Sequence, residues 1–165
     1  MKAFRQKIMH HDPENGIYGD CTRTAYASIL EMEPEMVPHF FHDGCSGGEG
    51  AKRIEAFLAQ IGLHRMILAT EQKPAEFLEY MGRMNPDLYW VMGCSSPTAD
   101  HSVVCLGGKV VHDPARETPG EYGKTESGWT WAEILIPIST VAESGRVVRT
   151  TEGAAETEGG PIDAN

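Results

Sequence analysis

Apolar residues recur at helical spacing in the first half of the chain. This pattern predicts helices at residues 21–31, 51–61 and 74–81. In the second of these segments the apolar residues fall at i, i+3, i+4 and i+7, which is typical of the buried face of an amphipathic helix. They are Ile54, Phe57, Leu58 and Ile61. The first segment is built from small and apolar residues, and we expect it to pack closely in the interior.

The second half of the chain has the pattern of a β-sheet. Unbroken or alternating apolar runs predict strands at residues 63–69, 88–92, 101–106, 109–112 and 129–138. Gly107 and Gly108 separate two of these runs and indicate a hairpin. Residues 1–9 and 147–148 are candidate edge strands, and residues 44–50 are expected to form a glycine-rich loop. Helices followed by a run of strands predict the α+β class.

Composition places limits on domains, partners and location. A chain of 165 residues favours one domain, which we expect at residues 1–150, followed by an acidic disordered tail at 151–165. The net charge of −10, without a basic stripe, argues against a nucleic-acid partner. No run of about 20 apolar residues is present, so no membrane partner is expected. The first ten residues lack the apolar centre of a signal peptide, and a cytoplasmic protein is expected.

The chemistry that the sequence predicts begins with Cys21, which follows the helix-capping residue Asp20. A thiol at a helix start lies near the positive end of the helix dipole and near free backbone N–H groups, and both favour the thiolate. His101 opens a predicted strand, and Asp113 follows the next one. A nucleophilic cysteine needs a base, and that base needs a group that orients it. The pattern therefore predicts Cys21 as nucleophile, His101 as base and Asp113 as the orienting acid.

The hairpin between His101 and Asp113 provides a geometric test of this prediction. A two-residue turn at Gly107 and Gly108 would pair His101 with Pro114, and Asp113 would then point to the opposite face of the sheet. The triad therefore requires a three-residue turn, a β-bulge, or an aspartate just beyond the regular strand.

These residues resemble those of papain-like cysteine peptidases, and they look closest to the small bacterial and phage proteins grouped with the bacteriocin-processing, double-glycine-leader peptidases. The resemblance covers most of residues 19–114, and it is carried by residues 19–31, 37–40, 93–97, 101–104 and 111–114. It implies a papain-like fold in which an N-terminal nucleophile helix packs on an antiparallel sheet. It also implies that a Cys21–His101–Asp113 triad hydrolyses a peptide or isopeptide bond of a peptide or protein substrate. No metal or organic cofactor is implied.

The same resemblance implies a glutamine that lines the oxyanion hole ahead of the nucleophile. Gln6 is the best match, with residues 10–18 as an insertion between it and the helix, and Asn15 is the alternative. The backbone N–H of Cys21 is a candidate for a second donor to the oxyanion.

Several alternatives remain open at the level of sequence. Cys94 is a rival nucleophile, whereas Cys45 is expected in a loop and Cys105 in the core. His39 and His42, with the aspartate that follows, are expected to be exposed loop residues and not metal ligands. Two other functions also remain: a cysteine amidase or acyltransferase acting on cell-wall peptides, and a catalytically idle papain-like module with a binding or phage-structural role.

Overall fold

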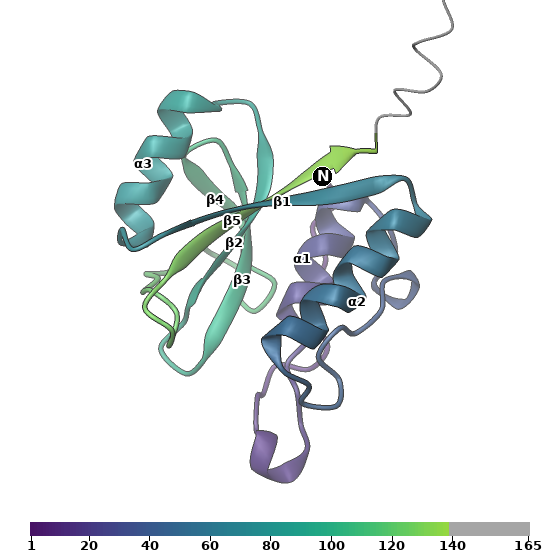
Figure 1. The fold of residues 1–165 in the computed structure, drawn as a ribbon. Helices are drawn as coiled ribbons and strands as arrows, with labels where there is room; N and C mark the ends of the chain where they lie inside the picture. Colours follow the sequence, from purple (N-terminus) through teal and green to yellow (C-terminus); the bar gives the residue numbers. More distant parts are fainter. Residues whose placement is uncertain (139–165) are drawn as a thin grey trace, which may run out of the picture.

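The computed structural model describes residues 1–138. The candidate edge strand at residues 147–148 and the acidic tail at 151–165 lie outside the described residues. Three α-helices and five strands make up the described part (Figure 1). The helices are α1 (Cys21–Leu30), α2 (Gly47–Gln60) and α3 (Pro74–Met84). The strands are β1 (Leu63–Thr70), β2 (Tyr89–Ser95), β3 (Asp100–Leu106), β4 (Lys109–His112) and β5 (Thr130–Pro137).

The five strands form one antiparallel sheet in the order β1-β5-β2-β3-β4. β5, the last of these five strands in sequence, is therefore inserted between the first two. Helices α1 and α2 lie against one face of the twisted sheet, and α3 lies on the other side (Figure 1). The α+β prediction is confirmed, and α1, which begins at Cys21, packs directly on β3.

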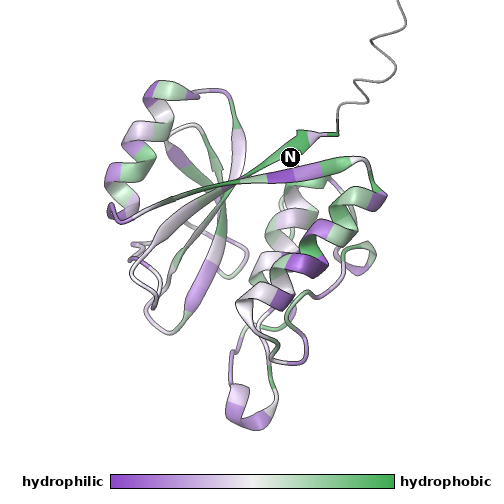
Figure 2. Ribbon diagram, viewed as in Figure 1, coloured by the Kyte–Doolittle hydropathy of each residue, from purple (hydrophilic) through white to green (hydrophobic). Residues whose placement is uncertain are grey.

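Each face of the sheet has its own hydrophobic core. On the α1 and α2 face, buried residues of both helices pack with Val91 and Val104 of the sheet. On the α3 face, Phe77 and Met81 pack with Trp90 and other strand residues. Hydrophilic and hydrophobic residues alternate along α2 and α3, as their amphipathic patterns predict (Figure 2). Burial of these apolar faces fixes both helical layers on the sheet.

Two local predictions were wrong. Residues 1–9 form no strand, although two backbone N–H groups, those of Lys2 and Gln6, bond to the carbonyl oxygens of Ser28 and Pro114. The glycine-rich segment is not all loop, because α2 begins at Gly47. The hydroxyl of Ser46 accepts a hydrogen bond from the N–H of Glu49 and caps the helix, which compensates for the poor helix propensity of glycine.

The hairpin between β3 and β4 has a two-residue turn together with a bulge. Leu106 pairs with Lys109, and Gly107 adopts the left-handed conformation (φ 51°) that favours glycine. The register then shifts, so that Val104 pairs with His112. This shift adds one residue to the β4 side of the ladder. Asp113 consequently falls on the same face of the sheet as His101, which is one of the arrangements that the triad requires.

Candidate active site

Cys21 is the first residue of α1 and is partly exposed. Asp20 occupies the capping position, but its carboxylate does not cap the helix. It accepts hydrogen bonds from the backbone N–H groups of Lys7 (3.3 Å) and Ile8 (3.0 Å). The N-terminal segment is thus tied to the start of α1, and the carboxylate leaves the N–H groups of the first turn of the helix free for other acceptors.

The start of α1 is also held on β3, close to the predicted base. The hydroxyl groups of Thr22 and Ser102 lie 2.9 Å apart and form a hydrogen bond. The thiol of Cys21 interacts with the backbone of Ser102 and with the imidazole of His101. Thr22 and Ser102, which are 80 positions apart in the sequence, are therefore brought together at the start of α1.

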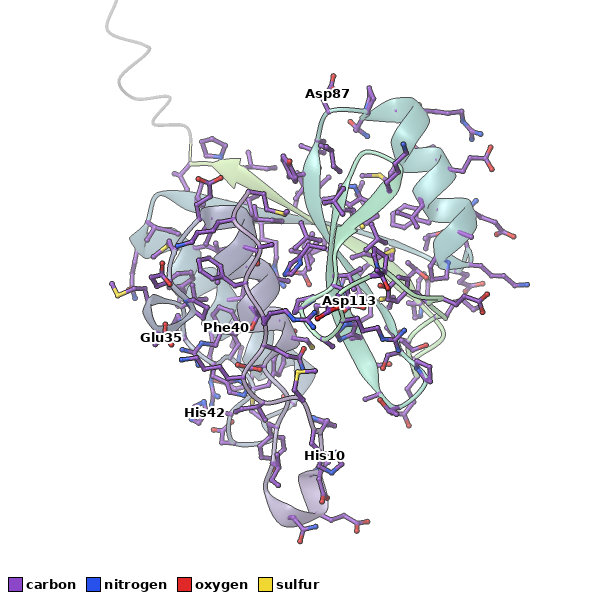
Figure 3. All side chains as sticks on the ribbon, turned by 180° about the vertical axis from the view of Figure 1, so that it is seen from behind. His10, Glu35, Phe40, His42, Asp87 and Asp113 are labelled. Carbon is purple, nitrogen blue, oxygen red and sulfur yellow. The ribbon has the colours of Figure 1, made fainter. Side chains whose placement is uncertain are left out.

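His101 and Asp113 form a buried pair. The Nε2 of His101 lies 2.9 Å from Oδ1 of Asp113, and the side chain of the aspartate is fully shielded from solvent. Asp113 also accepts hydrogen bonds from the N–H of Ala115 (2.8 Å) and the hydroxyl of Tyr122 (2.8 Å). In Figure 3, Asp113 lies near the centre of the molecule, between the helical part and the sheet. Because Nε2 is engaged by Asp113, Nδ1 is the ring nitrogen left to face Cys21.

The protonation of these groups follows from their contacts. Burial raises the pKa of Cys21, but the hydrogen bond and positive charge of His101 outweigh it and lower that pKa below its ordinary value. Burial lowers the pKa of His101, whereas its hydrogen bonds to Asp113 and Cys21 raise it to about 9. Burial likewise raises the pKa of Asp113, and the hydrogen bonds from His101 and Tyr122 lower it overall. The arrangement shifts the pair toward the thiolate–imidazolium form.

The other cysteines are in environments that keep them protonated. Burial raises the pKa of Cys94 and of Cys105, and both side chains are completely shielded from solvent. Cys45 is partly exposed, and its pKa is raised by burial and by the negative charge of Asp43, although Arg53 opposes this. Among the four cysteines, Cys21 alone has a lowered pKa. The environment of Cys94 therefore disfavours it as a nucleophile.

Gln6 and Asn15, the two candidates for the oxyanion amide, have different surroundings. Gln6 is buried, and its backbone N–H donates to the carbonyl of Pro114, the residue after Asp113. The next residue, Lys7, donates its backbone N–H to Asp20, the residue before Cys21. Its Nε2 donates to the carbonyl of Ile8 (3.0 Å) and retains a second N–H. Among the described residues, the amide oxygen of Gln6 is the one buried polar side-chain atom without a hydrogen-bond partner.

The amide of Asn15 is engaged elsewhere. Asn15 ends a short 3-10 turn (Pro13–Asn15) in the loop that protrudes at the bottom of Figure 1, and it is exposed. Its Nδ2 donates to Oδ2 of Asp12 at 2.6 Å. An amide that is already bonded on an exposed loop is poorly prepared to bind an oxyanion.

Tyr122 is a site residue that the sequence analysis missed. Its hydroxyl donates to the second carboxylate oxygen of Asp113, and its neighbour Gly123 forms a two-way backbone bridge with Ser95 of β2. The bridge attaches the loop after β4 to the sheet beside the His101–Asp113 pair. One tyrosine in a polar loop has no spacing that reveals this role, so sequence patterns contain no signal for it.

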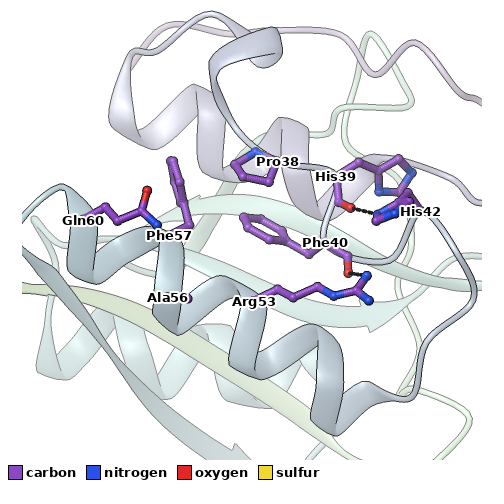
Figure 4. Close-up of a pocket in the computed structure, with 8 residues that line it drawn as sticks. All are labelled: Pro38, His39, Phe40, His42, Arg53, Ala56, Phe57 and Gln60. Carbon is purple, nitrogen blue, oxygen red and sulfur yellow. Dashed lines mark hydrogen bonds between the residues drawn. The ribbon is translucent and has the colours of Figure 1, made fainter.

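A separate hollow of about 460 Å³ lies between α2 and residues 38–42, which follow a 3-10 turn at Pro34–Met36 (Figure 4). It contains none of the triad residues. His39 and His42 are at its rim, and each imidazole bonds to a backbone carbonyl, of Tyr18 and of His39 respectively. Within residues 1–138, no three His, Cys, Asp or Glu side chains are grouped so that they could hold a metal ion.

Comparisons with protein-family models, with curated proteins and with solved structures found no match to this chain. The resemblance to papain-like peptidases therefore rests on the residues and on the geometry of the chain itself. In the part of the chain that the structure describes, no helix has the length and apolar character needed to cross a membrane.

Proposed function

We propose that this protein is a papain-like cysteine peptidase that hydrolyses a peptide or isopeptide bond. The observation that carries the proposal is the convergence of Cys21, His101 and Asp113 at the junction of α1 with β3. The three residues span more than ninety positions of sequence, and their contacts favour the reactive ionisation state of the thiol. A buried histidine with only a structural role would not be expected to face a partly exposed thiol at a helix start.

In the proposed reaction, the thiolate of Cys21 attacks the carbonyl carbon of the scissile bond, and the carbonyl oxygen becomes an oxyanion. The N–H of Cys21 and the free N–H of Gln6 are the proposed donors to that oxyanion. His101 gives its proton to the departing amine, which leaves a thioester on the sulfur. His101 then takes a proton from water, the hydroxide attacks the thioester, and the acid product leaves as the thiolate of Cys21 and the protonated imidazole are restored. Asp113 orients the imidazole throughout.

Selective alkylation tests the proposed site. We expect iodoacetamide to modify Cys21 at pH 7 at least about tenfold faster than Cys45, because a free cysteine is only a few per cent thiolate at that pH. Peptide mapping by mass spectrometry identifies the modified residue.

The pH dependence of peptide hydrolysis provides a second test. We expect the rate to decline above about pH 9, where His101 loses its proton, and to decline in acid, where the Cys21 thiolate gains one.

Screening with a peptide library then tests the reaction, with Cys21→Ala as the inactive variant and Cys45→Ala as the matched control. Cleavage by the wild type and by Cys45→Ala, but not by Cys21→Ala, supports the proposal. If Cys21 reacts no faster than Cys45 and no peptide is cleaved, the proposal is wrong and an idle binding module is favoured. Transfer of the acyl group to an amine in place of water would identify an acyltransferase.

The two oxyanion candidates can be separated by substitution. We expect Gln6→Ala to lower kcat by about 10²–10³-fold, the usual effect of losing one oxyanion donor. Asn15→Ala should leave kcat within about twofold of the wild type, because Asn15 is bonded to Asp12 on the exposed loop. Steady-state kinetics on a cleaved peptide measures both. An equal loss in the two variants, or a loss in Asn15→Ala alone, would contradict the assignment of Gln6.

A further inference from the structure

The two edges of the sheet are built differently. β4, at one edge, has only four residues and begins with Lys109. The N-terminal segment lies along the end of β4, because His112 bonds to the carbonyl of Phe4 and the N–H of Gln6 donates to the carbonyl of Pro114. Short length, a lysine and a covering segment are devices by which proteins prevent an edge strand from pairing with another chain.

β1, at the opposite edge, is long and apolar. Its eight residues contain no lysine or proline, and they pair with β5 in one unbroken register. Residues 66–69 are all exposed, and Met66, Ile67 and Leu68 are 39%, 49% and 37% exposed. The strand also has no acidic residue, although the net charge of the chain is −10. At β1, another chain therefore meets apolar side chains and little of the acidic charge that the rest of the protein carries.

The backbone groups on the outer side of β1 follow from its pairing with β5. The N–H of Ile138 donates to the carbonyl of Gly62 at 2.9 Å, and these residues extend the register that pairs Leu63 with Pro137. Bonded and non-bonded pairs alternate along an antiparallel ladder, so residues 64, 66, 68 and 70 bond to β5. Residues 63, 65, 67 and 69 therefore direct their N–H and C=O groups outward. Nothing else in residues 1–138 bonds to these outward groups, which form a row of free donors and acceptors.

This outer side of β1 is complementary to a second copy of itself. When two copies pair antiparallel about a two-fold axis at Ile67, the outward groups of each strand meet those of the other. Arg65 then faces Ala69 of the second copy, which is the smallest side chain in the strand. The arginines of the two copies do not face each other, so the pairing brings no like charges together.

A hollow of about 340 Å³ adjoins β1 on the α3 side of the sheet. Leu68 of β1 lines it together with Phe77 and Tyr80 of α3. In the two-fold arrangement, Met66 of the second copy faces Leu68 and therefore lies beside this hollow. An unbranched thioether side chain adapts well to an irregular apolar space, and the symmetry repeats the contact on the other copy.

We propose that two copies of this protein associate through their β1 strands, so that the five-stranded sheets of both copies join into one continuous antiparallel sheet. A strand of eight residues is about 26 Å long, so the contact is small beside the interface of a permanent dimer, and we expect reversible association in the micromolar range. Cys21 lies at β3, the third neighbour of β1 in the sheet, so the joined edge leaves the candidate active site open. The proposal does not depend on the proposed peptidase function.

Sedimentation equilibrium of the full chain, from low micromolar to submillimolar concentrations, tests this association. We expect the mass of the wild type to rise with concentration from that of one chain toward that of two. Ile67→Pro should weaken the association at least about tenfold, because both copies lose the outward N–H at the two-fold axis while the ladder with β5 stays intact. Met36→Lys is the control, because Met36 is 66% exposed in a 3-10 turn outside the sheet, and it should associate as the wild type does.

Ile67→Lys provides a second variant that keeps every backbone group of β1. Its two lysines would meet at the two-fold axis, so we expect their repulsion to abolish association. Circular dichroism and the melting temperature establish that each variant is folded. A wild type that remains a monomer at the highest concentration overturns the proposal. A dimer that persists unchanged in folded Ile67→Pro and Ile67→Lys overturns it as well, because that dimer forms through another surface.

Discussion

Replacing His101 with alanine is expected to lower peptide hydrolysis by about 10³–10⁴-fold, because proton transfer to the leaving amine and activation of the thiol both disappear. The same substitution should slow alkylation of Cys21 at pH 7 by at least about tenfold. In the wild type, the hydrogen bond and charge of His101 outweigh burial and lower the pKa of Cys21. Without His101, burial remains and raises that pKa, so the thiolate fraction at pH 7 falls to a few per cent or less.

A loss of hydrolysis in the His101 variant has to be distinguished from a loss of folding. His64→Ala is the matched control, because the imidazole of His64 is 66% exposed and pairs with Glu55 at 3.2 Å, far from the Asp113 carboxylate that His101 engages. Circular dichroism and the melting temperature establish whether each variant is folded. His101→Asn, which retains a polar group beside Asp113, provides a second variant if the alanine leaves that carboxylate unsatisfied. Unchanged alkylation of Cys21 in folded His101 variants would show that the pair does not activate the thiol.

Local patterns were sufficient for most of the helices and strands, because amphipathic spacing, caps and turn residues are encoded over short stretches of chain. They also selected Cys21, His101 and Asp113, whose catalytic roles stay a prediction. The α+β class followed from their order. The insertion of β5 between β1 and β2 could not be predicted in this way, since it depends on non-local pairs such as Ile67 with Glu133 and Val91 with Glu133. The same is true of the tyrosine that bonds to Asp113, whose loop is placed by the bridge between Ser95 and Gly123.

The bulge between β3 and β4 shows where sequence reasoning reached its limit. Two glycines permit several turns of nearly equal energy, and each turn gives Asp113 a different face. The structure combines the tight turn with a shift of one residue. Asp113 has three hydrogen-bond partners in the resulting position, from His101, Ala115 and Tyr122. A buried carboxylate with satisfied oxygens favours this register over the alternatives. Its partners lie in β3 and in the loop after β4, and their placement depends on how that loop packs.

Replacing Glu133 with alanine is expected to have the largest effect on stability, a loss of about 3–5 kcal/mol in the free energy of unfolding. Glu133 accepts hydrogen bonds from Arg65 (3.1 Å), from the indole of Trp131 (3.0 Å) and from the hydroxyl of Tyr26. The side chains of Arg65 and Glu133 are only 4% and 9% exposed. Removing the carboxylate leaves the buried guanidinium of Arg65 and the buried hydroxyl of Tyr26 without it, which costs far more than losing an exposed ion pair.

Glu55→Ala is the matched control for this prediction. Glu55 of α2 bonds to the same guanidinium through Nε of Arg65 (3.0 Å), but its side chain is 37% exposed, so its removal should cost no more than about 1 kcal/mol. Urea denaturation measures both values. Equal losses in the two variants would mean that water or Glu55 compensates for the missing carboxylate.

A triple variant shows whether the lost stability comes from unpaired buried polar groups or from lost packing. Combining Glu133→Leu with Arg65→Met and Tyr26→Phe replaces the buried network with apolar groups and should recover most of the lost stability, because no buried charge is left unpaired. Tyr26 is five residues from Cys21 on α1, so the network fixes α1 to β1 and β5. If the triple variant is stable but hydrolyses peptides more slowly while its iodoacetamide rate is unchanged, the network positions the substrate side of the site and not the thiol.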